Sequence, residues 1–409
     1  KALGLDGLVA VRTPDAELGV AEAFETLVGK PGDYANLPAD ALPDPGLHPE
    51  DDATIFYTSG TTGKPKGALG TQRNICTNLM NALLGGARSF LRRGEVPPAA
   101  DPNAPQRVTL LSVPLFHATG CHSILVGTYA SGGKLVIIHK WNPEQALELI
   151  ERERVTSFGG VPAMVWQVLE SPDFATRDTS SVESIGYGGA PSAPDLVARI
   201  KKQFPKCQPS NGYGLTETSA ITTQNLAEDY VARPDSAGVA VPVCDIKVVD
   251  EKGNELPRGQ VGELWIRGPN VVKGYWNKPE ATAAAITEGA WFHSGDLVRM
   301  DEEGFVYILD RAKDMLIRGG ENIYCVEVED ALYAHPAVMD AAVVAIPHKV
   351  LGEEVGAIVQ VAPGKQVSEE ELKAHVGKLL AAFKVPVKIE LRHEPLPRNP
   401  NGKILKTVL

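Results

Sequence analysis

The chain has 409 residues, of which 43% are hydrophobic and 22% charged, the proportions of an ordinary globular protein. Forty glycines and 31 prolines make turns frequent, which disfavours a helical bundle, a coiled coil or an α-solenoid. The net charge of −11 at pH 7 argues against DNA or RNA as the main partner, because duplex binders carry a basic face.

No segment approaches the roughly 20 consecutive apolar residues of a membrane helix. Five cysteines far apart in the sequence form neither a CxxC pair nor a disulfide framework, and no histidine spacing resembles a metal site. We therefore expect reduced, buried thiols in a cytoplasmic protein.

The first 100 residues contain one clear strand and one clear helix. A short helical pattern occurs near Glu17–Val28, and the run Ala53–Tyr57 predicts a strand. Apolar residues recur at helical spacing in Gln72–Leu84, which predicts a helix that ends at Gly85-Gly86. A polar, proline-rich surface loop is expected at residues 92–106.

Strand-like and helix-like segments then alternate, which predicts an α/β domain with mainly parallel strands. The expected strands are Val108–Val113, Lys134–Ile138 and Ser184–Tyr187, and the expected helices are Pro143–Arg154 and Pro194–Phe204. Short strands joined by Gly and Pro turns indicate a smaller antiparallel subdomain at Val239–Trp276.

The last hundred residues have the pattern of a self-contained α+β domain. Strands are expected at Ala341–Ile346 and Val355–Val361, and a helix at Glu369–Phe383 that begins with a capping box of Ser368 and Glu371. We place the domain boundary at Asp310, which gives a large domain of residues 1–309 and a smaller domain of residues 310–409.

The strongest chemical signal is the stretch Tyr57–Gly67, YTSGTTGKPKG, between the expected strand and helix. Its glycines let backbone N–H groups approach an anion, its hydroxyls donate hydrogen bonds, and its lysines add positive charge. Phosphate is therefore the expected ligand. The stretch is not a Walker A loop, because Gly60 and Gly63 are too close and Pro65 follows Lys64.

This stretch resembles the signature loop of the adenylate-forming superfamily, which contains acyl- and aryl-CoA synthetases, firefly-type luciferases and the adenylation domains of peptide synthetases. The resemblance continues in order over residues 50–409. Its further motifs are PLFH at 114–117, GYGGAP at 186–191, NGYGLTE at 211–217, HSGD at 293–296, DRAKD at 310–314, GGENIY at 319–324 and PNGK at 400–403.

The resemblance implies ATP, Mg²⁺ and coenzyme A as ligands and assigns a role to each motif. Tyr213 would stack on adenine, Thr216 would bond the α-phosphate, Glu217 would hold Mg²⁺, and Asp296 with Arg311 would hold the ribose. The other implied nucleotide-binding residues are Thr58, Ser59, Gly60, Thr61, Thr62, Gly63, Lys64, Lys66, Gly189, Ala190, Pro191, Asn211, Gly212 and Gly214.

The resemblance also implies a mobile C-terminal lid domain that turns about Asp310. Lys403 would be the catalytic lysine of the first half-reaction, and Gly319 and Gly320 would border the pantetheine tunnel in the second. His117 would lie between the acyl and pantetheine tunnels. Without the resemblance, a lone lysine or histidine in such a place is more often a solvated charge or a structural side chain.

The resulting hypothesis is an ATP-dependent acyl-CoA ligase that works through an acyl-AMP. Amino-acid-activating relatives place an Asp where this chain has Phe116-His117, which favours an acid that lacks an α-amino group. Small residues at Gly159-Gly160, Gly186 and Gly188-Gly189 suggest an open tunnel, hence medium- or long-chain fatty acids. An aryl acid such as a hydroxycinnamate and a non-catalytic AMP-binding module are the alternatives.

Two departures from the family pattern stand out. Cys325 replaces a common proline, and Ser294 replaces a common threonine. Full-length relatives also carry many more residues before the phosphate loop, so this chain is expected to lack part of the large domain. The expected partners are the small-molecule acid, ATP and CoA, together with a peripheral membrane contact for a lipid substrate and a homodimer.

Overall fold

The computed structural model describes residues 9–10, 19, 21–29, 44–58, 65–99, 101, 103–189, 194–312, 314–398 and 404–409. These fall into two units, residues 1–47 and residues 48–409. In the first unit, β1 (Val9–Ala10) pairs in parallel with β2 (Glu22–Ala23), and the helix α1 (Phe24–Val28) follows. Of the described residues in the helical pattern expected near Glu17–Val28, only Phe24–Val28 are helical.

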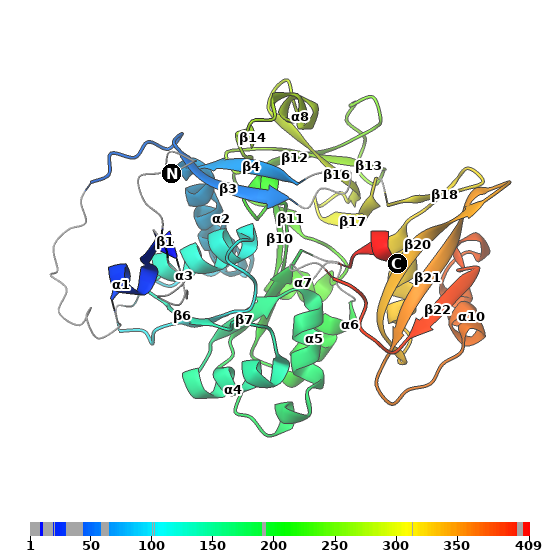
Figure 1. The fold of residues 1–409 in the computed structure, drawn as a ribbon, viewed down its shortest axis with the longest axis horizontal. Helices are drawn as coiled ribbons and strands as arrows, with labels where there is room; N and C mark the ends of the chain where they lie inside the picture. Colours follow the sequence, from blue (N-terminus) through cyan, green and yellow to red (C-terminus); the bar gives the residue numbers. More distant parts are fainter. Residues whose placement is uncertain are drawn as a thin grey trace. The chain divides into compact units, whose positions relative to one another are not determined.

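A seven-stranded sheet in the order β11-β10-β9-β8-β7-β5-β6 forms the centre of the second unit (Figure 1). Its strands are β5 (Val108–Leu111), β6 (Lys134–Ile137), β7 (Ser157–Gly160), β8 (Ser184–Gly188), β9 (Gln208–Tyr213), β10 (Thr223–Leu226) and β11 (Val239–Ala240). The strands from β6 to β9 are parallel, and β10 and β11 are antiparallel. The predicted α/β architecture is confirmed.

The segments between these strands are mostly helical. They are the π-helix η3 (Thr119–Leu125), α3 (Val126–Ala130), α4 (Pro143–Glu153), α5 (Pro162–Glu170), the 3-10 turn η4 (Pro172–Ala175), α6 (Asp195–Gln203), the 3-10 turn η5 (Thr216–Thr218) and α7 (Ala227–Ala232). Sequence alone predicted α4 and α6 to within a residue or two, because their apolar residues recur at helical spacing.

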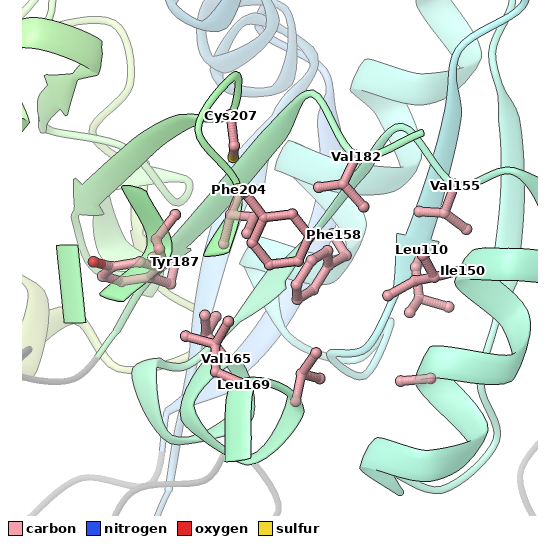
Figure 2. Packing of buried hydrophobic residues seen from close by; sticks show 14 of the residues in the cluster. Leu110, Ile150, Val155, Phe158, Val165, Leu169, Val182, Tyr187, Phe204 and Cys207 are labelled. Carbon is pink, nitrogen blue, oxygen red and sulfur yellow. The ribbon is translucent and has the colours of Figure 1, made fainter. Parts of the chain in front are cut away.

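A hydrophobic core lies between this sheet and its helices. Figure 2 shows Phe158 and Phe204 side by side within it, at an edge-on contact of 6.3 Å between ring centroids. Leu110, Ile150 and Ile185 are also fully buried there. The burial of these large side chains holds α4, α5 and α6 against the sheet.

Two smaller sheets complete the part of the chain before Asp310. One has the order β14-β4-β3, and the other is the antiparallel sheet β12-β13-β16-β15 with β17 on β16. Their strands are β3 (Asp52–Thr58), β4 (Lys66–Thr71), β12 (Asp245–Val249), β13 (Val261–Arg267), β14 (Gly274–Tyr275), β15 (Ile286–Thr287), β16 (Trp291–Met300) and β17 (Val306–Arg311), and α8 (Pro279–Ala285) follows β14. The expected antiparallel subdomain is present and extends beyond the predicted range.

The C-terminal segment forms a further sheet, β19-β18-β21-β20 with β22 on β21, against which α9 and α10 pack. Figure 1 shows α10 beside β22. The elements of this segment are β18 (Leu316–Arg318), β19 (Glu321–Ile323), α9 (Cys325–Tyr333), β20 (Val338–His348), β21 (Gly352–Val361), α10 (Glu369–Leu379), η6 (Ala382–Lys384), β22 (Lys388–Arg392) and η7 (Lys406–Val408). It has a hydrophobic core of its own. The hydroxyl of Ser368 accepts from the Glu371 N–H at 3.1 Å, which is the N-cap half of the predicted capping box.

The helix α2 (Gln72–Arg92) differs most from the sequence-based expectation. The prediction that it ends at Gly85-Gly86 is wrong, since the helix continues to Arg92. Glycine at position 85 allows close packing, because a Cβ there would lie 2.3 Å from the Gln224 side chain. Its buried face is polar and its exposed face carries apolar residues such as Met80 and Leu83. The Asn74 amide donates to the carbonyls of Pro269 and Val271 at 2.8 and 3.0 Å, so this polar face anchors a distant loop.

All five cysteines are free, but the expectation that all are buried is wrong for Cys76, which is exposed, and for the partly exposed Cys121. Among the residues that the structure describes, no helix is both long and apolar enough to cross a membrane.

Substitution by alanine is expected to have opposite effects on stability at Gly159 and Gly86. A Cβ at Gly159 would lie 1.5 Å from the Gly186 carbonyl oxygen, whereas a Cβ at Gly86 would meet nothing within 4 Å. We expect Gly159→Ala to lower the free energy of unfolding by about 1–3 kcal/mol or more. Gly86→Ala should raise it by about 0.5–1 kcal/mol, because alanine favours the helix.

Urea unfolding followed by circular dichroism measures both changes. Equal stability of Gly159→Ala and the unmodified protein would show that this glycine does not set the spacing of β7 and β8.

Candidate active site

Most of the predicted site residues line one cleft of about 2400 Å³ in the second unit. It opens where β8 and β9 end, which is the usual place for a ligand beside parallel strands. The predicted residues that line it are Thr58, Lys66, His117, Gly189, Asn211, Gly212, Tyr213, Gly214, Thr216, Glu217, Asp296 and Arg311. Ser59, Gly60, Thr61, Thr62, Gly63, Lys64, Ala190, Pro191 and Lys403 lie outside the described residues.

The two ends of the phosphate loop lie side by side. Thr58 is the last residue of β3 and Lys66 the first of β4, and the two residues are direct partners in the hairpin. The Thr58 hydroxyl donates to the Lys66 carbonyl at 3.4 Å. The hairpin therefore fixes where the loop begins and ends at the edge of the cleft.

Lys66, Tyr275 and Glu217 form a chain of contacts across the cleft. The Lys66 ammonium lies over the Tyr275 ring, 4.2 Å from its centroid. The Tyr275 hydroxyl donates to Glu217 Oε1 at 2.7 Å. Burial and the neighbouring carboxylate both raise the pKa of Tyr275, so its hydroxyl keeps its proton as a donor. A cation at the ring face and a carboxylate at the ring hydroxyl are thus both held by one aromatic side chain.

The turn that carries Thr216 and Glu217 has an unusual backbone. Ser219 and Ala220 have φ values of 56° and 99°, which side chains other than glycine rarely adopt. The Glu217 carbonyl accepts from the Val272 N–H at 2.9 Å, and Thr218 bonds both backbone groups of Leu215. These bonds hold the strained turn in place, as is common at functional sites.

Glu217 fits the role of a magnesium ligand. Its side chain is buried within a turn at the cleft, and the hydroxyl of Tyr275 orients its carboxylate. A hard cation such as Mg²⁺ binds with one protein carboxylate together with phosphate oxygens and water. Among the described residues, no group of three or more His, Cys, Asp or Glu side chains is placed to hold a metal ion.

Tyr213, Asp296 and Arg311 form a second cluster. The Tyr213 hydroxyl donates to Asp296 Oδ2 at 2.5 Å, and Arg311 Nε lies 3.3 Å from Oδ1. Asp296 and Arg311 face each other across β16 and β17, so the sheet register sets this ion pair. Burial is the main cause that raises the pKa of Tyr213. The Ser294 hydroxyl accepts from the Asp296 N–H at 3.1 Å, a bond that a threonine hydroxyl could also make.

His117 is half-buried at the start of the π-helix η3. Its Nδ1 accepts from the Thr119 N–H at 3.2 Å, so the proton of the neutral ring is on Nε2. His122, inside the same helix, is buried and makes an edge-on contact with Phe56 at 5.0 Å between ring centroids. Burial lowers the pKa of His122, which therefore remains neutral near pH 7.

The predicted hinge residue Asp310 is tied to the start of α9. Its carboxylate accepts from the Cys325 N–H at 2.5 Å and from the Arg311 N–H at 2.7 Å. A proline at position 325 would have no N–H to donate. The replacement noted in the sequence therefore supplies a bond to the hinge. Burial raises the pKa of the Asp310 carboxyl.

The described residues on both sides of Lys403 are anchored by ion pairs. Arg398 pairs with Asp340, and Lys406 Nζ lies 2.7 Å from Glu329 Oε1. Arg398 also forms an isolated β-bridge with Ile404, which brings the two ends of the intervening segment together. The backbone on either side of Lys403 is therefore fixed to the C-terminal sheet and to α9.

Gly159, Gly160, Gly186, Gly188 and Gly189 all line the cleft, as the sequence suggested, but neighbouring atoms fill the Cβ positions of those in β7 and β8. A Cβ at Gly188 would lie 2.1 Å from the Gly212 carbonyl oxygen, and one at Gly160 would lie 2.7 Å from the Met164 sulfur. These glycines let strands and side chains approach closely. Gly319 and Gly320 form the turn between β18 and β19 with φ values of 58° and 91°, and neither lines the cleft.

Two family models match the chain. The model described as "AMP-binding enzyme" matches residues 10–276, and the model described as "AMP-binding enzyme C-terminal domain" matches residues 327–403. The chain belongs to the AMP-binding enzyme family. It is thus a member of the adenylate-forming superfamily, as the motifs indicated, and its relatives are AMP-forming acid–thiol ligases.

A feruloyl-CoA synthase of Amycolatopsis sp is 37% identical over 97% of this chain and 77% of its own length. A long-chain-fatty-acid–CoA ligase of Bacillus subtilis (strain 168) is 37% identical over 88% of this chain and 62% of its own length. The solved structure of ATP-bound MatB from Rhodopseudomonas palustris has a TM-score of 0.77 at 33% identity, over 88% of this chain and 68% of that one.

Sequence reasoning missed Tyr275 and Lys406. Tyr275 lies in GYW, which has the pattern of an ordinary apolar strand, and only its pairing with β4 brings it to the cleft. Lys406 follows Lys403 by three residues and has the pattern of a solvated charge. The signal in the sequence that could have pointed to Lys406 is its place three residues after Lys403 of the PNGK motif.

The Tyr213 hydroxyl predicts a measurable loss of stability. Tyr213→Phe removes a donor from Asp296, which is 4% exposed, so we expect the free energy of unfolding to fall by about 1–3 kcal/mol. The matched control Tyr307→Phe removes a longer bond of 3.2 Å to the part-exposed Asp301 and should cost less. Urea unfolding compares the two, and equal losses would contradict the importance assigned to the Tyr213 bond.

Proposed function

We propose that the chain is an ATP-dependent ligase that joins a carboxylic acid to coenzyme A through an acyl-AMP. The observation that carries this proposal is the meeting of two clusters in one cleft. Lys66 and Glu217 offer a cation and a metal-binding carboxylate for phosphates, and Asp296 with Tyr213 offers an acceptor and an aromatic face for a nucleoside.

In the first half-reaction, a carboxylate oxygen of the acid attacks the α-phosphorus of ATP and pyrophosphate leaves. Both reactants are anions, so the barrier is mainly electrostatic and positional. Lys66 and the phosphate loop would bind the phosphates, and Thr216 would donate to the α-phosphate. Mg²⁺ held at Glu217 would supply further positive charge beside these phosphates. Lys403 would neutralise the charge that develops at the reacting centre.

In the second half-reaction, the CoA thiolate attacks the acyl carbon and AMP leaves. We propose that residues 310–409 form the mobile domain and turn about Asp310 between the two steps. Because Arg398 and Lys406 form ion pairs with this domain, the segment that contains Lys403 would move together with it. Gly319 and Gly320 would then border the pantetheine, and His117 would lie near the junction of acyl group and thiol.

The acid that fits the available observations best is a hydroxycinnamate-type aryl acid. Gly160 and Gly188 line the cleft, but neighbouring atoms fill their Cβ positions, so these two glycines do not by themselves widen it for a long fatty-acyl chain. The 37% identity to the feruloyl-CoA synthase over 97% of this chain supports the aryl acid. Medium- or long-chain fatty acids remain the second candidate, which the equal identity to the long-chain-fatty-acid–CoA ligase favours.

A non-catalytic AMP-binding module is the alternative to an enzyme. Such a module would have no need to anchor both sides of Lys403 with buried carboxylates, which are costly to bury. A cytoplasmic location, a homodimer and a peripheral membrane contact stay predictions from the sequence alone.

Pyrophosphate exchange into ATP tests the ligase proposal and the choice of acid together. We expect exchange and CoA-thiol consumption with ferulate and 4-coumarate to exceed those with octanoate, laurate and palmitate. Rates that rise along the fatty-acid series, with about 0.8 kcal/mol gained per buried methylene, would favour the fatty-acyl candidate instead. Nucleotide binding without exchange for any acid would support the non-catalytic module.

Lys403→Ala predicts a separation of the two half-reactions. We expect pyrophosphate exchange to fall by roughly 100-fold, because Lys403 would act on charge that develops only in that step. Thioester formation from synthetic acyl-AMP should change little. Lys349→Ala removes an exposed lysine of the turn between β20 and β21 and serves as the control. Equal losses in both half-reactions would contradict the two-conformation mechanism.

A further inference from the structure

Tyr275 contacts two opposite charges that the proposed function needs to keep separate. Lys66 lies against the face of its ring at 4.2 Å from the centroid, and Glu217 accepts from its hydroxyl at 2.7 Å. One side chain therefore touches both the phosphate-loop cation and the metal-binding carboxylate.

The backbone holds this ring in place from both sides. Tyr275 is the register partner of Ala68, two residues after Lys66, and the next residue, Trp276, donates its N–H to the Gly67 carbonyl at 2.8 Å. The Tyr275 N–H donates to the Thr282 hydroxyl at 2.8 Å. The ring thus has a fixed position relative to the end of the phosphate loop.

The loop before β14 is fixed to the turn that carries Glu217. The Val272 N–H donates to the Glu217 carbonyl at 2.9 Å, and the neighbouring carbonyl of Val271 accepts from the buried Asn74 amide. The distance between the ring and the carboxylate is therefore set by the backbone on both sides of Tyr275, in addition to the hydrogen bond between their side chains.

Opposite charges in a partly buried cleft attract each other strongly. A lysine that could reach Glu217 would form an ion pair, and the pair would have to break before the carboxylate could bind a metal and the ammonium a phosphate. The aromatic face stabilises the ammonium by a cation–π interaction, which competes with movement of the ammonium toward the carboxylate. The hydroxyl orients the carboxylate in the way that outer ligands orient metal-binding side chains.

We propose that Tyr275 is a positioning residue that separates Lys66 from Glu217 and orients the Glu217 carboxylate for the divalent cation that accompanies ATP. This inference rests on the proposed function. It assigns the ring and the hydroxyl different tasks, so two substitutions separate them. Tyr275→Phe keeps the separating ring and removes the hydroxyl, and Tyr275→Leu removes both.

The test uses Mn²⁺ as a spectroscopic probe, with α,β-methylene-ATP as a nucleotide that cannot react and with neither acid nor CoA present. Electron paramagnetic resonance of the free ion then reports metal affinity without turnover. We expect Tyr275→Phe to weaken Mn²⁺ binding about tenfold, the lower end of outer-ligand effects. Tyr275→Leu should weaken it more, because Lys66 would then pair with Glu217.

The background variant Lys66→Met tests the separation itself. In the unmodified protein it should weaken binding of the metal–nucleotide complex, because it removes a phosphate contact. In the Tyr275→Leu background the loss should be smaller or become a gain, since the competing ion pair disappears with the charge. Tyr307→Phe is the matched control. Arg299 lies 4.3 Å from the centroid of the Tyr307 ring, and the Tyr307 hydroxyl donates to the carboxylate of Asp301. Tyr307→Phe should leave Mn²⁺ binding unchanged.

Each result decides something different. Unchanged Mn²⁺ affinity in Tyr275→Phe would overturn the orienting role, and additive effects of Lys66→Met and Tyr275→Leu would overturn the separating role. If Tyr275→Leu fails to fold, Tyr275→Phe still tests the role of the hydroxyl. Equal effects of Lys66→Met in the unmodified protein and in Tyr275→Phe would then exclude coupling through the Tyr275 hydroxyl. If the unmodified protein binds neither Mn²⁺ nor the nucleotide, the proposed function itself fails.

Discussion

The pairing of β4 with β3 on one side and β14 on the other determines the rest of the site. Through this pairing, the two ends of the phosphate loop, Tyr275 and the Glu217 turn come from three distant parts of the chain and meet at one edge of the cleft. The pairing depends on backbone hydrogen bonds, which have narrow geometric tolerance. A shift of one residue in the β14 register would turn Tyr275 to the opposite face of the sheet and leave Lys66 and Glu217 without it.

Charged side chains at the site are paired in ways that fix geometry more than they add stability. Asp296 with Arg311, Glu329 with Lys406 and Asp340 with Arg398 each combine a buried carboxylate with a cation from another element. Such pairs contribute little net free energy after desolvation, but the loss of one partner is costly. They occur where the nucleoside and the segment around Lys403 would have to be held in a definite position. The cost of burial at these places is consistent with a role in positioning.

The elements of the parallel sheet could be predicted because their patterns are local. The helix α4 has Asn142 as N-cap, Pro143 at its first position and apolar residues at helical spacing, so its limits follow from neighbouring residues alone. The end of α2 could not be predicted in this way. The helical penalty of Gly85 is only about 1 kcal/mol, and its contact with Gln224 is made by a residue far away in the sequence.

The same distinction applies to the site. The loop at Tyr57–Gly67 could be predicted because its chemistry lies in consecutive residues. The role of Tyr275 depends on a register that the sequence does not express. The glycines of β7 and β8 do line the cleft, but the absence of a side chain does not reveal whether the space beside a glycine is empty or filled by a neighbouring atom.

The hydrogen bond from the Cys325 N–H to Asp310 gives this chain a feature that a proline at position 325 would not allow. An amide in a bond to a buried carboxylate exchanges its hydrogen with solvent only when that bond opens. Since the bond joins the first residue of α9 to the last residues of β17, it must break whenever α9 moves away from that strand. The rate of hydrogen exchange at the Cys325 amide would therefore report how often Asp310 and α9 separate, without a label attached to the protein.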